Sequence, residues 1–321
     1  MSTRSRSSSG PSRARSVVAQ PPLPALPLEP WEPTKNTLHL WAQIVGKVAL
    51  GTAPPQNHWW HTALRVDPRG LRTRTLHHDG VRFDLAFDFV LHELIARTGR
   101  GQRETIDLRD GLSVADFDAA VHELLGDLGA DVPILEVPYG VPMTTPFRED
   151  REHASYDADA VERWFAVMSW ADEVLQEFAG WFTGKTSPVH AFWHSFDLAV
   201  TRFSGRRAPV DPGADPVTRE AYSHEVVSFG FWAGDATVRE PMFYSYTAPE
   251  PEGLADRPLA PDAASWGEAY GGSMALLPYD AVRASPDPRA ALLQFLQSAY
   301  DAGAGAAGWD RDDLRSSYAP A

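Results

Sequence analysis

The sequence predicts an α+β fold in which two similar halves, each made of a helix, an antiparallel sheet and a further helix, pack together. Three observations lead to this expectation. Helical periodicity recurs in four segments, period-two strand patterns follow the first and third of these segments, and a proline-rich stretch separates the two sets. The 321 residues, 43% hydrophobic and 22% charged, suffice for one large domain or two closely packed halves.

The first half is expected to open with a helix over residues 34–50, capped by Thr34 or Asn36, because apolar residues recur there every three or four positions. Residues 59–109 then alternate apolar and polar side chains between turn signals, which predicts a meander of about five strands. A second helix is expected over residues 113–129, beginning at a serine cap and ending at a glycine.

The second half repeats this order of elements. A helix is expected from 157 to 182, with Asp159 and Glu162 as a capping box, followed by strands and a last helix near 289–302. The strands are expected from residue 191, over 224–231 and over 242–246.

A short repeated word supports an internal duplication. Trp60-His61-Thr62 and Trp193-His194-Ser195 each follow a Gly-Lys pair and are each expected to open an apolar strand. The alternative is coincidence, because the words are short and their spacing from the Gly-Lys pair differs by five residues.

Composition suggests how the chain is divided. The first 28 residues contain four arginines and no acidic residue, and they lack the apolar segment of a secretory signal, so we expect disorder there. The predicted divisions are a basic tail at 1–29, a first half at 30–135, a proline-rich linker at 136–150, a second half at 151–310 and a tail at 311–321.

Charge and cysteine content exclude several classes of function. The net charge of −14 becomes more negative without the basic tail, and such a surface repels nucleic acid and anionic lipid. The chain has no cysteine, so disulfides, thiolate nucleophiles and thiolate metal sites are excluded. No stretch of eighteen apolar residues predicts a membrane span, and we expect a cytoplasmic protein. The sequence predicts no oligomeric state.

Histidines in aromatic surroundings are the first candidates for chemistry. His61, His194 and His224 are expected to supply metal ligation or proton transfer, with Glu225 polarising a neighbouring imidazole. A divalent metal is one option, and the cofactor stays unknown. Such a site needs histidines from several strands, because strand residues three apart face opposite ways and residues four apart lie about 13 Å from each other. The alternative is that these histidines are core or rim residues with satisfied hydrogen bonds.

A ligand cleft between the halves is the second expectation, and it includes a group of arginines. Its expected lining consists of His58, Trp59, Trp60, His190 and Trp193, with His153 and Tyr156 free to face the same cleft. Arg202, Arg206 and Arg207 are expected to clamp the carboxylate or phosphate of a small anionic molecule. The alternative is that these arginines form surface ion pairs with neighbouring acids.

Five segments resemble a bacterial family catalogued only as a domain of unknown function. The resemblance covers about residues 30–310 and implies membership in that family, but it implies no activity. The segments are NHWWH at 57–61, DREHASYD at 150–157, SPVHAFWHSFDLAVTRFSGRRAP at 187–209, REAYSHEVVS at 219–228 and LLPYDAVR at 276–283.

Two functions of different class therefore remain. The first is a small-molecule enzyme, metal-dependent or acting by acid–base chemistry, and the second is a noncatalytic ligand-binding or partner-binding scaffold. The sequence has no phosphate loop, dinucleotide fingerprint, nucleophile elbow or HExxH motif, so the commonest nucleotide, hydrolase and zinc-protease functions are not supported.

Overall fold

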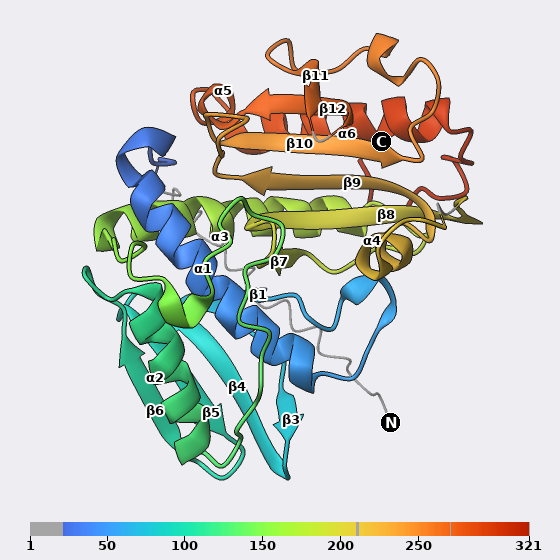
Figure 1. Cartoon of the computed structure of the whole chain (residues 1–321). Helices are drawn as coiled ribbons and strands as arrows, with labels where there is room; N and C mark the ends of the chain where they lie inside the picture. Colours follow the sequence, from blue (N-terminus) through green and yellow to red (C-terminus); the bar gives the residue numbers. More distant parts are fainter. Residues whose placement is uncertain (1–21, 210–211, 270, 321) are drawn as a thin grey trace, which may run out of the picture.

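Two antiparallel sheets of six strands each, together with six α-helices, form the part of the protein that the computed structural model describes, which is residues 22–209, 212–269 and 271–320 (Figure 1). The first half contains α1 (Leu28–Thr52), η1 (Asn57–Trp59), β1 (Arg65–Asp67), β2 (Gly70–Arg72), β3 (Leu76–His78), β4 (Val81–Asp88), β5 (Glu93–Thr98), β6 (Arg103–Asp107) and α2 (Val114–Asp127). The second half contains η2 (Phe147–Glu149), α3 (Ala158–Gly180), β7 (His190–Phe192), β8 (Asp197–Arg207), α4 (Pro216–Ala221), β9 (His224–Trp232), β10 (Met242–Ala248), η3 (Leu254–Asp256), β11 (Ser265–Ala269), β12 (Gly272–Pro278), α5 (Tyr279–Arg283) and α6 (Pro288–Ala306).

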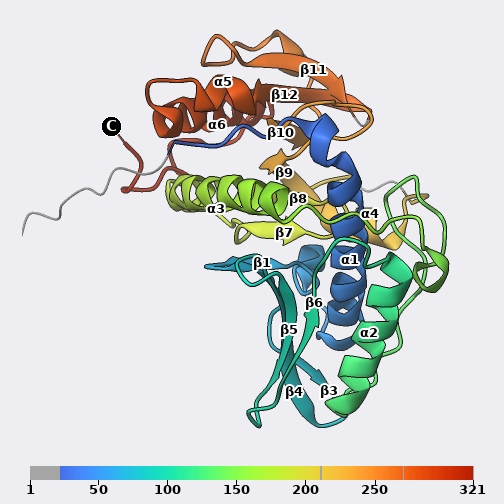
Figure 2. The same ribbon diagram turned by 90° about the vertical axis from the view of Figure 1, so that its left-hand side faces the viewer.

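The two sheets meet edge to edge. The first has the order β1-β2-β4-β5-β6, with β3 paired to β4, and the second has the order β11-β12-β10-β9-β8-β7. Leu64, just before β1, and Ala191 in β7 exchange two backbone hydrogen bonds of 3.0 Å, which link the two edges. In Figure 2, α3 and α6 cover one side of the second sheet, whereas α1 and α4 lie on the other side.

Helix α1 is buried around most of its circumference between residues 37 and 49, which is typical of a helix in the interior of a fold. It crosses both sheets in Figure 1 and contacts α2 and α3. Trp41 of this helix stacks on Phe117 of α2 with ring centroids 4.9 Å apart, and Trp164 of α3 stacks on Phe196 at the same distance. One continuous hydrophobic core therefore extends through both halves.

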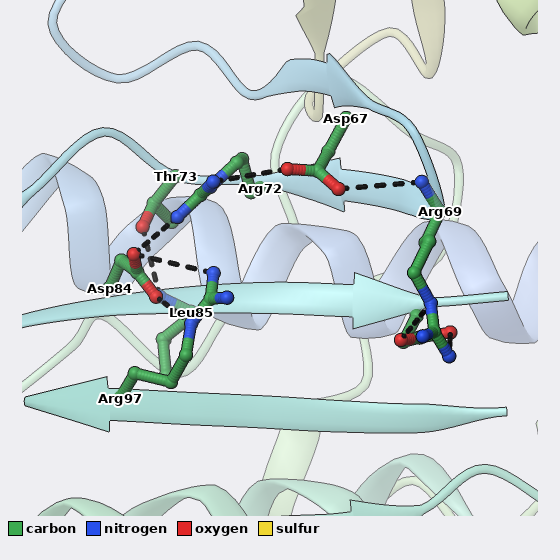
Figure 3. A network of polar contacts seen from close by, with 8 residues as sticks. Asp67, Arg69, Arg72, Thr73, Asp84, Leu85 and Arg97 are labelled. Atoms are coloured by element: carbon green, nitrogen blue, oxygen red, sulfur yellow. Dashed lines mark hydrogen bonds and ion pairs between the residues drawn. The ribbon is translucent and has the colours of Figure 1, made fainter. Parts of the chain in front are cut away.

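Ion pairs connect the strands on the polar face of the first sheet (Figure 3). Arg72 of β2 bridges Asp67 of β1, at 3.0 Å, and Asp84 of β4, at 2.5 Å. Arg97 of β5 also contacts Asp84, with Nε and Oδ1 3.0 Å apart. These residues alternate along their strands with core residues, so one face of the sheet is charged and the other apolar.

Several sequence predictions of the helices are close to the structure, and two caps differ. Ser113 caps α2 by accepting a hydrogen bond from the Asp116 amide, as expected. Helix α1 begins at Leu28 rather than at a cap near residue 34, because Pro27 ends the preceding extended segment. Helix α3 is capped by the Asp157 side chain, which accepts from the Ala160 amide, so the predicted Asp159–Glu162 capping box is wrong.

The described end of the predicted basic tail belongs to the fold. Leu26 is buried, and the Tyr279 hydroxyl donates a hydrogen bond of 2.7 Å to the Pro24 carbonyl. The prediction of disorder up to residue 29 was therefore wrong for residues 22–29. The prolines fix the backbone of this segment but do not prevent its leucines from packing. Residues 1–21 lie outside the described part.

The Trp-His segments form turns, which corrects the strand prediction. His58 and Trp59, both in η1, have φ values of 55° and 60°, and the first strand starts only at Arg65. Residues 193–196 connect β7 to β8, and the Phe196 amide closes this turn on the Phe192 carbonyl at 2.7 Å. Packing of the large rings overrides their strand preference at both places.

Each half opens with a helix and contains six strands, but α4 interrupts the strands of the second half and two helices, α5 and α6, follow them, so the structure does not show a duplication. In the first sheet β3 leaves the linear path, whereas in the second the β11–β12 hairpin, which the sequence analysis missed, forms one edge. None of the described helices is both long and apolar enough to cross a lipid bilayer.

Candidate functional site

A cavity of about 740 Å³ lies on the face of the second sheet that α3 and α6 leave uncovered. Strand alternation builds its floor, because successive side chains of a strand point to opposite faces. In β8, Asp197, Ala199, Thr201 and Phe203 line the cavity, whereas Arg202 lies against Phe178 of α3. Residues from β9, β10 and the β11–β12 hairpin continue the floor, and they include Ser228, Trp232, Tyr244, Tyr246, Ala269 and Met274.

The walls of the cavity come from segments far apart in sequence. Trp59 and Trp60 approach from the turn after α1, and Trp193 from the β7–β8 turn. The Trp193 indole nitrogen donates a hydrogen bond of 3.1 Å to the Thr62 carbonyl, which joins these two turns. Tyr139, in the irregular segment before η2, also lines the cavity. The side-chain amide of Gln43 in α1 holds it: Oε1 accepts from the Tyr139 backbone amide at 2.8 Å, and Nε2 donates to the Tyr139 carbonyl at 2.9 Å.

A buried carboxyl group is the polar centre of the cavity. Asp197 Oδ1 accepts a hydrogen bond of 2.5 Å from the Ser195 hydroxyl, and Oδ2 accepts one from the Tyr244 hydroxyl. Burial raises the pKa of Asp197, and the two hydroxyl donors oppose this effect without cancelling it. Burial, and secondly the charge of Asp197, raises the pKa of Tyr244 well above the usual value, so the phenol is a hydrogen-bond donor at neutral pH.

His194 supplies a second titratable group beside Asp197. Burial lowers the pKa of the His194 imidazole, and the negative charge of Asp197 acts in the opposite direction. The backbone carbonyl of His194 lies 3.2 Å from Nε2 of His39, a buried histidine of α1. A carboxyl with a raised pKa and an imidazole with a lowered one therefore both line the cavity and interact electrostatically, and both are candidates for proton transfer with a ligand.

Two further groups of polar side chains face the cavity. The hydroxyls of Tyr222 and Tyr246 lie 3.1 Å apart, and those of Thr201 and Ser228 lie 2.9 Å apart. Burial raises the pKa of Tyr246 well above the usual value. These hydroxyls are neutral donors and acceptors, so they can orient a ligand without adding charge.

His58 lines the cavity and is held there by Lys185, which does not itself line it. His58 Nδ1 lies 3.1 Å from the Glu220 carbonyl, which fixes the proton on Nδ1 and makes Nε2 the acceptor for Lys185 Nζ at 2.7 Å. The Lys185 ammonium group also lies over the rings of Phe203, at 4.7 Å, and Trp60, at 5.3 Å. Burial lowers the pKa of Lys185.

The structure brings some of the predicted site residues together and separates others. His58, Trp59, Trp60, Trp193 and His194 all line the cavity. The remaining predicted histidines, His61, His190, His224 and His153, do not line it.

Each of these four histidines has its own surroundings. His61 Nδ1 accepts from the Gln56 amide at 3.2 Å, and His190 is enclosed by Trp60 and Phe192. The His224 ring lies edge-on to His58, with centroids 5.7 Å apart. His153 Nδ1 pairs with a carboxylate oxygen of Asp150 at 2.8 Å.

The predicted metal set of His61, His194 and His224 is not gathered into one coordination centre. Within the described ranges, the cluster of three potential ligands is a different one, formed by Asp118, His122 and Glu136. Tyr156 is likewise separate from the cavity, because its hydroxyl contacts His92 at 3.0 Å and its ring stacks on Trp41.

The three arginines do not form a shared anion clamp. Arg202 is buried between α3 and α6, where its guanidinium lies 3.6 Å from the centre of the Phe178 ring and 4.6 Å from that of Tyr300. Arg206 binds Glu225, with Nη2 and Oε2 2.7 Å apart, so Glu225 is held by an arginine and not by an imidazole. Arg207 is exposed near the end of β8.

Sequence reasoning missed the residues at the polar centre, Asp197, Ser195 and Tyr244. A signal for Asp197 was present, because Asp197, Ala199 and Thr201 alternate with apolar residues in a strand whose other face is core. Partners from β10 could not be assigned without the pairing of the strands.

The comparisons with known proteins give a family. The model of a family of unknown function, DUF5996, matches residues 23–316, so the chain belongs to this family, as the resemblance implied. A search of curated proteins found no match, and neither did a search of solved structures.

Proposed function

We propose that this member of the DUF5996 family binds a small, largely apolar organic molecule in the cavity of the second sheet, with Asp197 as its acid–base group. The observation that carries the proposal is a buried carboxyl facing a cavity of about 740 Å³ and held by Ser195 and Tyr244. Ligand sites are typically concave and mostly apolar, with a few converging polar groups.

The lining favours a neutral or cationic ligand over an anionic one. Three acids, Asp197, Asp235 and Glu250, line the cavity together with one lysine, Lys47, and the three arginines predicted to clamp an anion do not line it. The indoles of Trp59, Trp60 and Trp193 offer flat apolar surfaces, and the faces of such rings also attract cations. A ring-containing molecule with a hydroxyl, carbonyl or amine group suits these walls and the carboxyl.

Asp197 and His194 are the proposed proton-transfer groups. A carboxyl whose pKa is raised by burial holds its proton closer to neutral pH and can donate it as a general acid. His194, with its lowered pKa, is the neutral base beside it. Ser195 and Tyr244 act as positioning residues, since each fixes one carboxyl oxygen.

A cavity-filling substitution tests the binding site. The Ala199→Phe substitution places a ring into the floor, and Thr105→Phe, on an exposed strand position of the first sheet, is the matched control. A library of small cyclic alcohols, ketones and amines is screened by ligand-observed NMR. Hits that bind the parent and T105F but not A199F support the proposal, whereas hits unaffected by A199F, or no hits at all, contradict it.

The pH dependence of binding distinguishes an acid–base site from a passive one. The Asp197→Asn substitution keeps the shape and removes the titrating proton, and Tyr244→Phe removes one hydrogen bond to the carboxyl. If Asp197 titrates in the complex, the affinity of the parent depends on pH and the affinity of D197N does not. In Y244F the pH at which the affinity changes should move upward, because a lost hydrogen bond to the carboxylate raises the pKa of Asp197. Affinity that is equally pH-independent in all three would favour the alternative function, a noncatalytic binding protein.

A further inference from the structure

We propose that Asp118, His122 and Glu136 form a binding site for a first-row divalent metal ion, with Zn²⁺ as the best-suited ion. Asp118 and His122 are one turn apart on α2 and therefore share one face of the helix. Glu136 comes from the irregular segment that follows α2. The potential ligand atoms of all three lie within 4.8 Å of one another.

The spacing of the ligand atoms suits tetrahedral coordination. Metal–ligand bonds of about 2.1 Å place two ligand atoms of a tetrahedral zinc site about 3.4 Å apart. His122 Nε2 lies 3.4 Å from Glu136 Oε1 and 3.8 Å from Asp118 Oδ1. An ion could therefore enter with small side-chain adjustments.

Unsatisfied buried oxygen atoms provide an independent argument. Asp118 is only 4% exposed, and its Oδ1 accepts no hydrogen bond within the described part of the chain. Oε2 of Glu136 is also buried and has no hydrogen-bond partner within the described residues. Buried carboxylate oxygens usually have hydrogen-bond partners, because an unpaired one costs the full desolvation of the group. A metal ion would supply the missing interaction for Asp118.

The nearby cations do not replace a metal ion. Lys47 and Arg148 act on the two carboxylates only through longer-range Coulomb interactions, and Arg148 itself approaches Glu149 at 3.6 Å.

The donor set determines the class of ion. One imidazole and two carboxylates suit Zn²⁺ and its first-row neighbours better than Ca²⁺, which takes six to eight oxygen ligands. Three protein ligands leave a fourth position for water. The side chain of His122 is 32% exposed, which gives an ion a path from solvent.

A bound ion would fasten a wall of the cavity. Leu135 and Tyr139, on either side of Glu136, both line the cavity. The segment is otherwise held here by Gln43 and by the Glu136 carbonyl, which accepts from the Phe147 amide at 2.8 Å. Metal binding would therefore also attach residues 135–139 to α2, because the Glu136 side chain and the two ligands on α2 would bind the same ion.

Titration calorimetry with ZnCl₂ on the chelator-treated full-length protein tests the site. We expect one equivalent of Zn²⁺ in the parent and an affinity at least about a hundredfold lower in the Asp118→Asn variant, because loss of a direct ligand should cost no less than loss of an outer partner. The control is His153→Gln, since His153 forms a similar histidine–aspartate pair that lacks a third ligand. This variant should bind like the parent.

Two further readouts complete the test. Co²⁺ should give the visible absorption of a four-coordinate site in the parent and in H153Q but not in D118N, and Zn²⁺ should slow amide hydrogen exchange in residues 135–139. No uptake of one equivalent, or equal uptake by D118N with its fold intact by circular dichroism, would overturn the proposal. The A199F variant should keep its Zn²⁺ affinity, so failure of the cavity proposal and failure of this one are separate results.

Discussion

Buried His190 makes the stability of the protein sensitive to acid. The residue is 2% exposed, Trp60 and Phe192 surround its ring, and Nδ1 has no hydrogen-bond partner in the described structure. Burial lowers its pKa from 6.5 to about 4. Between these two values the unfolded chain binds a proton that the folded protein does not, so stability falls as the pH drops below 6.5.

The His190→Phe substitution isolates this effect and gives its magnitude. pH 5 is about 1.5 units below the pKa of histidine in the unfolded chain. At about 1.4 kcal/mol per pH unit, the folded protein therefore loses about 2 kcal/mol of stability at pH 5. Phenylalanine fits an aromatic environment and does not titrate. The free energy of unfolding of H190F should therefore fall by about 2 kcal/mol less than that of the parent between pH 7.5 and pH 5.

Urea unfolding followed by circular dichroism at the two pH values measures this difference. Other titrating groups, such as Asp172, whose pKa burial raises to about 6, contribute equally to both proteins and cancel. His77→Phe makes the same change on the exposed side of β3 and serves as the control. If the parent and H190F lose the same stability, His190 is not kept neutral by burial and the reasoning is refuted.

Three other substitutions test the packing. Gly46→Ala would place a Cβ 2.2 Å from the Trp193 ring and should cost about 1–3 kcal/mol in urea unfolding, whereas Gly51→Ala on the same helix, with 3.5 Å to its nearest neighbour, should cost nothing; equal effects would contradict the contact. Arg202→Met should leave the unfolding free energy unchanged or higher, because it removes a buried charge without a carboxylate partner; a loss above about 2 kcal/mol would show that the aromatic rings and the Phe178 carbonyl, which accepts a hydrogen bond from Arg202, compensate the charge. Ser113→Ala should lower the thermal stability by about 1 kcal/mol through loss of the cap of α2, and an unchanged melting temperature would contradict this role.

The Trp-His segments show where sequence reasoning was misled. Tryptophan and histidine at 59–61 and 193–194 occur in sequences that look like strand starts, yet both segments turn. The turns are held together by contacts between the halves, such as the hydrogen bond of Trp193 to Thr62, and no local pattern contains that information.

The sequence by itself determined the α+β class, the course of the long helices, the serine cap of α2 and the absence of any cysteine-based chemistry. These features depend on local periodicity and composition, which are properties of neighbouring residues. Only the tertiary structure decided which polar side chains meet. Asp197 finds Tyr244 through strand pairing, and Glu136 reaches Asp118 because an irregular segment folds back onto α2. Contacts between residues far apart along the chain depend on packing of the whole core, so spacing alone could not reveal either site.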